Sequence, residues 1–280
     1  IYATNFIQQS TPLKNNWNWI SVYVNNPDTD NEVNGVLESL DSNGASIKST
    51  DQVIEYLDEY GWLGDDDLIY NDKMYKLKMT KADTLVANGE QTTVTDIEVK
   101  NGWNWVPYTR NFPLSVDDAM AGASPVRNDQ VKGQDGFAMY NGTVWTGKLT
   151  SLEPGKGYLY KSNSAEGTII KYPAQRNVAP VAEARVMRTL QTSMFSPIDP
   201  SEYESNMTVL AIVKDGEEVV KNVQEVAVFN GSVCLAAATV ESDGFFYLTI
   251  PGDKTLKEKL SVYVVVDGEG VALFTDIRNG

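Results

Sequence analysis

Asn16-Trp17-Asn18-Trp19-Ile20-Ser21 sets the architecture of this chain, because the same pattern returns as Gly102-Trp103-Asn104-Trp105-Val106-Pro107. Both tryptophans are displaced by the same 86 positions (103 − 17 = 105 − 19 = 86). Two Trp-x-Trp pairs at one fixed spacing indicate an internal duplication. A repeat has to be recognised before any single element is assigned, because it determines the domain organisation.

Further matches follow each copy of this pattern. The offset is 84 for Ile47-Lys48 with Val131-Lys132 and for Tyr56 with Tyr140, and 83 for Trp62-x-Gly64 with Trp145-x-Gly147 and for Lys73-x-Tyr75 with Lys156-x-Tyr158 (131 − 47 = 84, 145 − 62 = 83). Small steps in the offset are what loop deletions between fixed elements produce. We therefore expect one β-rich repeat over residues 1–92 and a second over residues 93–178.

Each repeat is predicted to contain one short helix. In the first repeat, apolar residues recur at helical spacing behind Asp30 or Asn31 as N-cap; these residues are Val33, Val36, Leu37 and Leu40. In the second repeat, Ser115 opens a sequence typical of a capping box, with Ala119 and Met120 on the inner side.

The rest of each repeat is predicted to be about five strands. Asn141-Gly142 follows Phe137-Ala138-Met139-Tyr140 and predicts a hairpin with a type I′ turn, which leads into Trp145. Helix propensity alone would allow a helix over 53–57, but the clearer second copy favours a strand there.

A linker and a third domain follow the repeats. Residues 179–200 are rich in Ala, Pro and Arg and are predicted to be a linker. Residues 201–280 alternate short strands with turn pairs such as Asn230-Gly231 and Asp243-Gly244, which is typical of an immunoglobulin-like β-sandwich. The predicted fold class is therefore mostly β, with two tandem repeats followed by an antiparallel sandwich.

The composition restricts the chemistry. The net charge of −15 disfavours nucleic acid as a partner, and no apolar run is long enough for a membrane span. The chain has no histidine, which removes His-based catalytic and metal-binding chemistry, and its one cysteine, Cys234, lies in an apolar strand pattern. We expect no cofactor and no metal. Because the chain begins at Ile1 without a signal peptide, we expect a processed form or a fragment.

Several of these segments together carry a resemblance. The Trp-Asn-Trp-Ile-Ser strand, the Ile47-Lys48-Ser49 segment and the Trp-x-Gly hairpin resemble a tandem module of secreted and surface-attached proteins of Bacteroidetes-type bacteria. Residues 226–231 and 247–253 look like the sandwich that often accompanies it. In that pattern an Arg-Gly pair commonly follows Asn-Gly, whereas Cys234-Leu235 stands here. The resemblance implies an exported, non-enzymatic module and supplies no catalytic residues.

The aromatic residues allow two interpretations. Alternating aromatics commonly build small cores, and we expect Trp17 and Trp19 to do so. Indoles also stack on sugar rings, and for this role the residues beside the hairpin turns are the better candidates. The predicted ligand-binding residues are therefore Trp62, Trp145, Tyr140 and Tyr158.

Two acidic motifs were considered as further sites. Asp28-x-Asp30-x-Glu32 begins like a calcium loop, but Val33 and Ser39 stand where Gly and Glu are needed. Asp65-Asp66-Asp67 is typical of a solvated turn. A glycoside hydrolase needs only two carboxylates, but none of the 38 acidic residues lies in a distinguishing motif.

The sequence as a whole predicts a non-catalytic module located outside the cell or on its surface. It would be an adhesion-type structural part of a larger bacterial protein or assembly, with a glycan or another surface protein as partner. A carbohydrate-binding module that uses hairpin tryptophans is the alternative, and a carboxylate-based glycoside hydrolase is the third. A protein partner bound along an edge strand of the sandwich also remains an interpretation.

Overall fold

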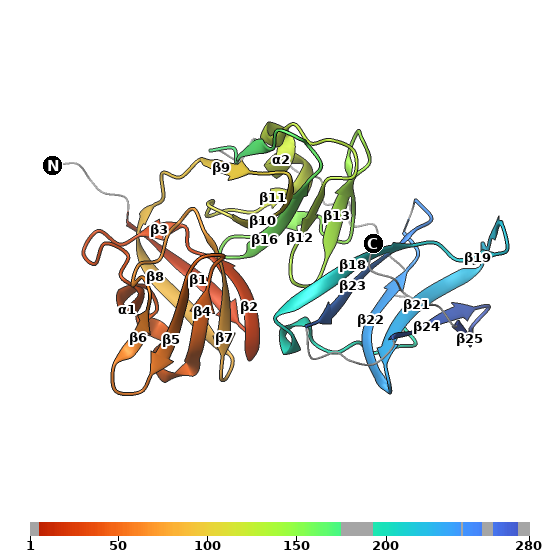
Figure 1. The fold of residues 1–280 in the computed structure, drawn as a ribbon, viewed down its shortest axis with the longest axis horizontal. Coiled ribbons are helices and arrows are strands. Elements are labelled where there is room, and N and C mark those ends of the chain that lie inside the picture. Colours follow the sequence, from red (N-terminus) through yellow and green to blue (C-terminus); the bar gives the residue numbers. More distant parts are fainter. Residues whose placement is uncertain (1–5, 175–192, 242, 254–259, 274–280) are drawn as a thin grey trace. The chain divides into compact units, whose positions relative to one another are not determined.

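The computed structural model describes residues 6–174, 193–241, 243–253 and 260–273. The chain divides into two compact units, Ile1–Arg176 and Asn177–Gly280, and each is described by itself. Both units are built mainly of antiparallel strands with a few short helices, so the predicted mostly-β fold class is confirmed (Figure 1). Within the described residues, no helix is long and apolar enough to cross a membrane.

Unit 1 contains two five-stranded antiparallel sheets with the same strand order. The first has the order β2 (Asn16–Ser21), β7 (Met74–Met79), β4 (Gly44–Lys48), β5 (Val53–Leu57) and β6 (Gly61–Gly64). The second has the order β10 (Gly102–Pro107), β16 (Gly157–Ser162), β12 (Gln130–Lys132), β13 (Phe137–Tyr140) and β14 (Trp145–Gly147). Each Trp-x-Trp pattern thus forms the first, outermost strand of its sheet, and the strand predicted over 53–57 is present.

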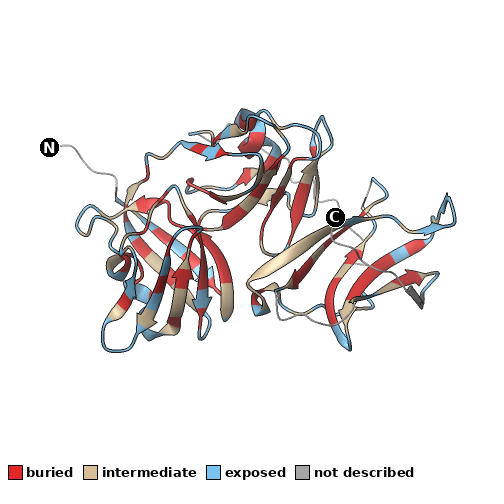
Figure 2. Cartoon of the chain, viewed as in Figure 1, coloured by how far each residue is buried: buried red, intermediate tan, exposed pale blue. Residues whose placement is uncertain are grey.

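Smaller elements close the other side of each core. In the first repeat they are β1 (Phe6–Leu13), β8 (Asp83–Gln91) and β3 (Val24–Asn25), with helix α1 (Val33–Val36) and the 3-10 helix η1 (Glu38–Asn43). In the second repeat they are the pairs β9 (Asp96–Val99) with β17 (Thr168–Lys171) and β11 (Leu114–Ser115) with β15 (Ser151–Leu152), with helix α2 (Val116–Met120) and η2 (Ala121–Ala123). Buried and exposed positions alternate along β1 and β9, whereas consecutive residues are buried in β2 and β7 (Figure 2).

The two helix starts differ. Ser115 is the N-cap of α2, and its side chain accepts a hydrogen bond from the Asp118 N–H at 3.1 Å, as predicted. The N-cap of α1 is Glu32, which makes no side-chain cap, so the prediction of Asp30 or Asn31 is wrong. Both residues adopt positive φ values, 47° and 60°, and form a turn one step earlier.

The repeated Trp-Asn-Trp pattern has a backbone cause. The preceding residue adopts a positive φ in both copies, 65° at Asn16 and 91° at Gly102, which asparagine and glycine tolerate best. The central asparagine then holds the chain that enters the strand. Asn18 accepts from the Lys14 N–H and donates to the Lys14 carbonyl, both at 2.8 Å. Asn104 makes the same pair with Lys100, at 2.8 and 2.7 Å.

The repeated Trp-x-Gly pattern reflects close packing of neighbouring strands. A Cβ at Gly64 would lie 2.4 Å from the Val53 carbonyl oxygen, and one at Gly147 would lie 2.3 Å from that of Phe137. In each copy a helix residue accepts a hydrogen bond from the backbone N–H of the tryptophan. The backbone N–H of Trp62 donates to the Asn34 side chain at 2.9 Å, and that of Trp145 donates to the Asp117 side chain at 3.1 Å. Asn34 also donates to the Trp62 carbonyl at 3.1 Å.

The hairpin of the second repeat is present, but its turn is wider than predicted. Tyr140 pairs with Trp145, so four residues form the loop instead of two. Gly142 has a φ of 104°, whereas Asn141 has no positive φ, which excludes the type I′ turn. The Asn141 side chain instead accepts from the backbone N–H groups of Thr143 and Val144. This local hydrogen bonding is the competing preference that the dipeptide rule overlooks.

Unit 2 is a sandwich. Its four-stranded sheet has the order β22 (Val233–Thr239), β21 (Val223–Asn230), β24 (Leu260–Val266) and β25 (Glu269–Leu273). The second layer is the pair β18 (Ser205–Ala211) with β23 (Phe246–Gly252). Val226 and Leu235 of the four-stranded sheet share one core with Leu248 of β23. The short pair β19 (Lys214–Asp215) with β20 (Glu218–Val219) and the 3-10 helix η3 (Pro200–Glu202) complete the unit.

The domain boundaries differ from the prediction in two ways. The two repeats form one compact unit instead of two separate ones. The predicted linker, 179–200, lies outside the described residues up to 192, but its last part belongs to the sandwich. Phe195 packs on Phe229 at 5.5 Å between ring centroids, and the Ile198 N–H donates to the Cys234 carbonyl at 3.0 Å.

The fully buried side chain of Gln9 stands in for a missing strand next to β2. It donates to the Ser21 carbonyl at 2.9 Å and accepts from the Tyr23 N–H at 2.8 Å. Methionine has a similar size but cannot make either bond, so Gln9→Met would leave two buried backbone groups unpaired. We expect a loss of roughly 2–5 kcal/mol in the free energy of unfolding of unit 1, measured by thermal or urea denaturation.

Gln8→Met is the matched control, because the amide of Gln8 is exposed and donates to the Asn88 side chain at 3.0 Å. Its effect should stay within about 0.5 kcal/mol. Equal effects of the two substitutions would contradict the assigned role of Gln9.

Candidate functional site

The hairpin aromatics that the sequence favoured as a glycan site lie in the two cores. The exposed fractions are 2% for Trp62, 9% for Trp145 and 3% for Tyr158, and Tyr140 is half-buried. Trp62 and Tyr56 pack edge-to-face at 5.5 Å between centroids, and Trp145 and Tyr140 pack at 5.4 Å. Neither indole presents a face to a ligand, so the prediction that they are accessible is wrong. A residue next to a turn still follows the alternation of its strand, and here that alternation points inward.

The strand tryptophans occupy the opposite face of their sheets. Trp17 and Trp19 pair across strands with Lys78 and Lys76, and none of these four side chains belongs to the core cluster of the first repeat. The core side of β2 carries Ile20. Trp19 is nevertheless buried, with 2% of its surface exposed, whereas Trp17 is half-buried, so the prediction that both are core residues holds for Trp19, on this other face, and fails for Trp17.

Four indoles and four ammonium groups lie in neighbouring cation–π contacts on these faces, and we name the set the indole–lysine ladder. Its members are Trp17, Trp19, Trp103, Trp105, Lys48, Lys76, Lys78 and Lys132. The ammonium nitrogen lies 5.0 Å (Lys48) and 5.7 Å (Lys78) from the Trp17 ring centroid and 4.6 Å (Lys132) from the Trp103 centroid. These distances are within the range of cation–π attraction.

Lys76 joins the two repeats within the ladder. Its nitrogen lies 5.0 Å from the centroid of Trp19, in the first repeat, and 4.8 Å from that of Trp105, in the second. Beside it, Gln134 of the second repeat donates to the Trp17 carbonyl at 2.6 Å and accepts from the Trp19 N–H at 3.2 Å. The free edge of β2 is thus bound by a side chain of the other repeat.

The accessible part of the ladder is in the second repeat. Trp103 is 47% exposed, whereas Trp19 is 2% exposed and Trp17 and Trp105 are half-buried. Burial, and secondarily the charge of Lys76, lowers the pKa of Lys132 from 10.5 to about 8. The ladder therefore combines a solvent-facing indole with a lysine that is easily neutralised.

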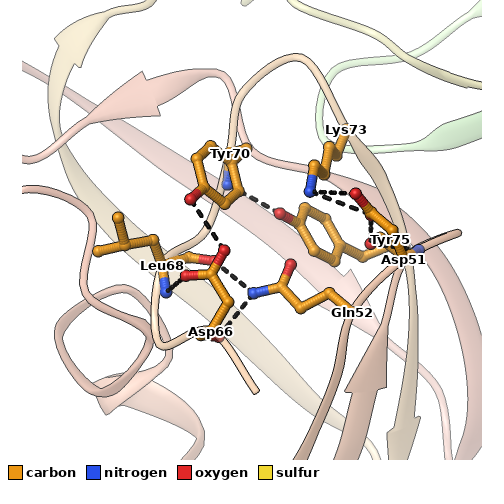
Figure 3. Close-up of polar contacts among 8 residues, drawn as sticks. Asp51, Gln52, Asp66, Leu68, Tyr70, Lys73 and Tyr75 are labelled. Carbon is orange, nitrogen blue, oxygen red and sulfur yellow. Dashed lines mark hydrogen bonds and ion pairs between the residues drawn. The ribbon is translucent and has the colours of Figure 1, made fainter. Parts of the chain in front are cut away.

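A second polar cluster ties together the loops of the first repeat (Figure 3). Lys73 forms an ion pair with Asp51 at 3.0 Å, and a hydrogen bond from Ser49, followed by that from Lys73, lowers the pKa of Asp51. The Tyr70 N–H donates to the Tyr75 hydroxyl at 2.8 Å. The second repeat keeps this contact between the Glu153 N–H and the Tyr158 hydroxyl, at 2.7 Å, which explains the repeated tyrosine of the Lys-x-Tyr pattern.

The carboxylates near this cluster serve the fold. Asp66 accepts from the Tyr70 hydroxyl at 2.8 Å and from the Leu68 N–H at 3.1 Å, and the Gln52 amide donates to the Asp66 and Leu68 carbonyls, both at 2.7 Å (Figure 3). Among the described residues, no group of three or more Asp, Glu or Cys side chains is arranged to hold a metal ion. The hydrogen bonds of this cluster close a loop.

Comparisons with known proteins identify no relative: no protein-family model, no curated protein and no solved structure matches this chain. The function of the chain is therefore inferred from the residues of the ladder and of the loops.

The lowered pKa of Lys132 leads to a pH-dependent prediction. A lysine whose pKa is lower in the folded than in the unfolded state destabilises the fold when protonated, fully below the folded pKa, and the penalty disappears as the pH rises from about 8 to 10.5. Lys132→Met should therefore raise the stability of unit 1 by roughly 1–3 kcal/mol at neutral pH, and this gain should shrink towards about pH 10. Thermal unfolding at several pH values measures it.

Lys161→Met is the control, because Lys161 is a half-buried lysine on β16 that pairs with Trp103 of the neighbouring strand β10. It should show no comparable gain. A Lys132→Met effect that is the same at neutral pH and at about pH 10 would contradict the assignment.

Proposed function

We propose that this chain is a non-catalytic, exported surface or adhesion-type module of a larger bacterial assembly, in which unit 1 acts as a rigid scaffold. The observation that carries the proposal is the joining of the two repeats. The Ser21 N–H donates to the Gly155 carbonyl at 3.0 Å, and the Ser21 hydroxyl donates to the Lys156 carbonyl at 2.7 Å. Hydrogen bonds to the backbone of the other repeat favour a rigid arrangement of the two repeats over one in which they open and close around a substrate.

The use of the acidic side chains supports a non-catalytic role. Asp129 is 1% exposed, and its carboxylate accepts from the Tyr160 hydroxyl and the Asn163 N–H, both at 2.7 Å. An acid or base catalyst has to reach a substrate proton, which a carboxylate held in this way cannot do. The resemblance to surface-attached tandem modules supports the location outside the cell.

The test combines turnover and location. The purified chain should release no product from a panel of aryl glycosides at acidic or neutral pH, and external protease should remove it from intact cells of its source. Turnover that disappears on substitution of a single carboxylate, or complete protection of the chain in intact cells, would overturn the proposal.

Carbohydrate binding is the second candidate, and the exposure of Trp103 favours it. An indole that is 47% exposed offers a flat apolar surface on which a sugar ring can stack. The site would lie on the ladder, on the face opposite the hairpin tryptophans.

Trp103→Ala should abolish binding of any glycan found on an array, with at least about a tenfold loss of affinity by calorimetry, if the indole stacks on the sugar. Tyr60→Ala is the matched control, because Tyr60 is a 69% exposed aromatic residue outside the ladder. Binding that survives Trp103→Ala unchanged, or an array without hits, would rule out this candidate.

A further inference from the structure

Residues 193–198, which we name the strap, lie on the outer face of the four-stranded sheet of unit 2. The register of β21 and β24 places Ala227 opposite Tyr263, whereas Val226 and Val264 point into the sandwich core. The side of the sheet that faces away from the core is nevertheless apolar and largely buried, since Ala227 is 0% and Val265 1% exposed. This sheet therefore has two covered faces.

An aromatic cluster holds one residue of the strap. The Phe195 ring lies 5.5 Å from Phe229 and 6.5 Å from Tyr263 between centroids, and the latter two rings lie 5.0 Å apart. Phe195 and Phe229 pack edge-to-face, as do Phe229 and Tyr263, which is a favourable arrangement of aromatic rings. Phe195 is thus the apolar anchor of the strap.

A buried carboxylate holds the residues just before it. Glu225 is 5% exposed, and its two oxygens accept from the Ser193 hydroxyl and, at 2.8 Å, from the Met194 N–H. Removing a buried carboxylate from its donors is costly, because the charge is left without compensation in a poorly solvated site. The site next to Glu225 consequently requires a segment that offers two hydrogen-bond donors, a side-chain hydroxyl and the backbone N–H of the following residue.

The contacts define a short recognition pattern. The hydroxyl residue and the following N–H bind Glu225, while the Ser193 oxygen accepts from the Phe195 N–H at 3.2 Å and so orients the ring two residues later. The Met194 side chain takes no part, because 57% of it is exposed. The pattern is therefore Ser-x-Phe.

We propose that Glu225, Phe229 and Tyr263 form a peptide-binding groove, which the strap of the same chain occupies and which accepts a Ser-x-Phe segment supplied from outside when the strap is displaced. The ligand class is an extended peptide with a hydroxyl residue, an unblocked N–H and an aromatic ring two positions on. This goes beyond the scaffold role of unit 1, since it gives unit 2 a means of attaching a neighbouring chain.

The experiment uses the full chain with the double substitution S193A/F195A, which removes the hydroxyl and the aromatic ring that hold the strap in the groove, and a fluorescent synthetic peptide of residues 192–199 as probe. Fluorescence anisotropy should show saturable binding to the double variant and at least about tenfold weaker binding to the unsubstituted chain, whose groove is occupied. The peptide should also raise the melting temperature of the double variant. A peptide with Ala in place of Ser and Phe should do neither.

Two further variants keep the test decisive. Adding Glu225→Gln to the double variant should weaken peptide binding about tenfold, because a charge-assisted pair of bonds is lost. Adding Glu218→Gln, at an exposed glutamate, should leave it unchanged. If the double variant fails to fold, F195A alone, which retains the Ser193 contacts, takes its place. Absence of binding to every folded variant, equal binding to the unsubstituted chain, or binding indifferent to Glu225→Gln would overturn the proposal.

Discussion

The structure of unit 1 depends on primary amide side chains that take the place of neighbouring strands. A strand exposes alternate N–H and C=O groups along each edge, and a carboxamide carries one acceptor and two donors, so it satisfies both kinds of group at once. Gln9 does this for Ser21 and Tyr23, Gln134 for Trp17 and Trp19. Short sheets with many ends are thereby closed without additional strands, and their edges are blocked against unwanted pairing.

This mode of closure also explains how two repeats become one body. The edge of β2 that Gln134 and Gly155 cover would otherwise be open, and both of these residues belong to the second repeat. Lys76 adds to them by lying between an indole from each repeat. The outer strands of the two copies therefore differ in burial. Trp19 is buried, whereas its counterpart Trp105 is half-buried.

Much of the fold followed from the sequence because its signals are local. The duplication fixed which segments correspond, and alternation together with turn pairs located the strands, including the one over 53–57 that propensity left ambiguous. The direction in which the strands face did not follow, since the tryptophans of β2 alternate with Asn18 and Ile20, and aromatic residues are the usual choice for a core. In the folded chain, Ile20 faces the core cluster of the first repeat, and Trp17 and Trp19 lie on the other face.

Proximity to a turn was a poor guide to exposure for the same reason, as the buried side chain of Trp62 demonstrates. The strap escaped prediction because its anchors, Glu225 and Phe229, are some 30 positions away in the sequence (225 − 193 = 32) and carry no motif.

The contact between Asn34 and Trp62 bears on how the protein ages. Asparagine hydrolyses to aspartate most readily before glycine, and Asn34 precedes Gly35. The reaction yields both isoaspartate and aspartate, and the aspartate would keep the acceptor for the backbone N–H of Trp62 and lose the donor to the Trp62 carbonyl. The second repeat already has this arrangement, because Asp117 accepts from the Trp145 N–H. Chemical ageing at this position would thus convert one copy of the repeat to the chemistry that the other copy carries in its sequence.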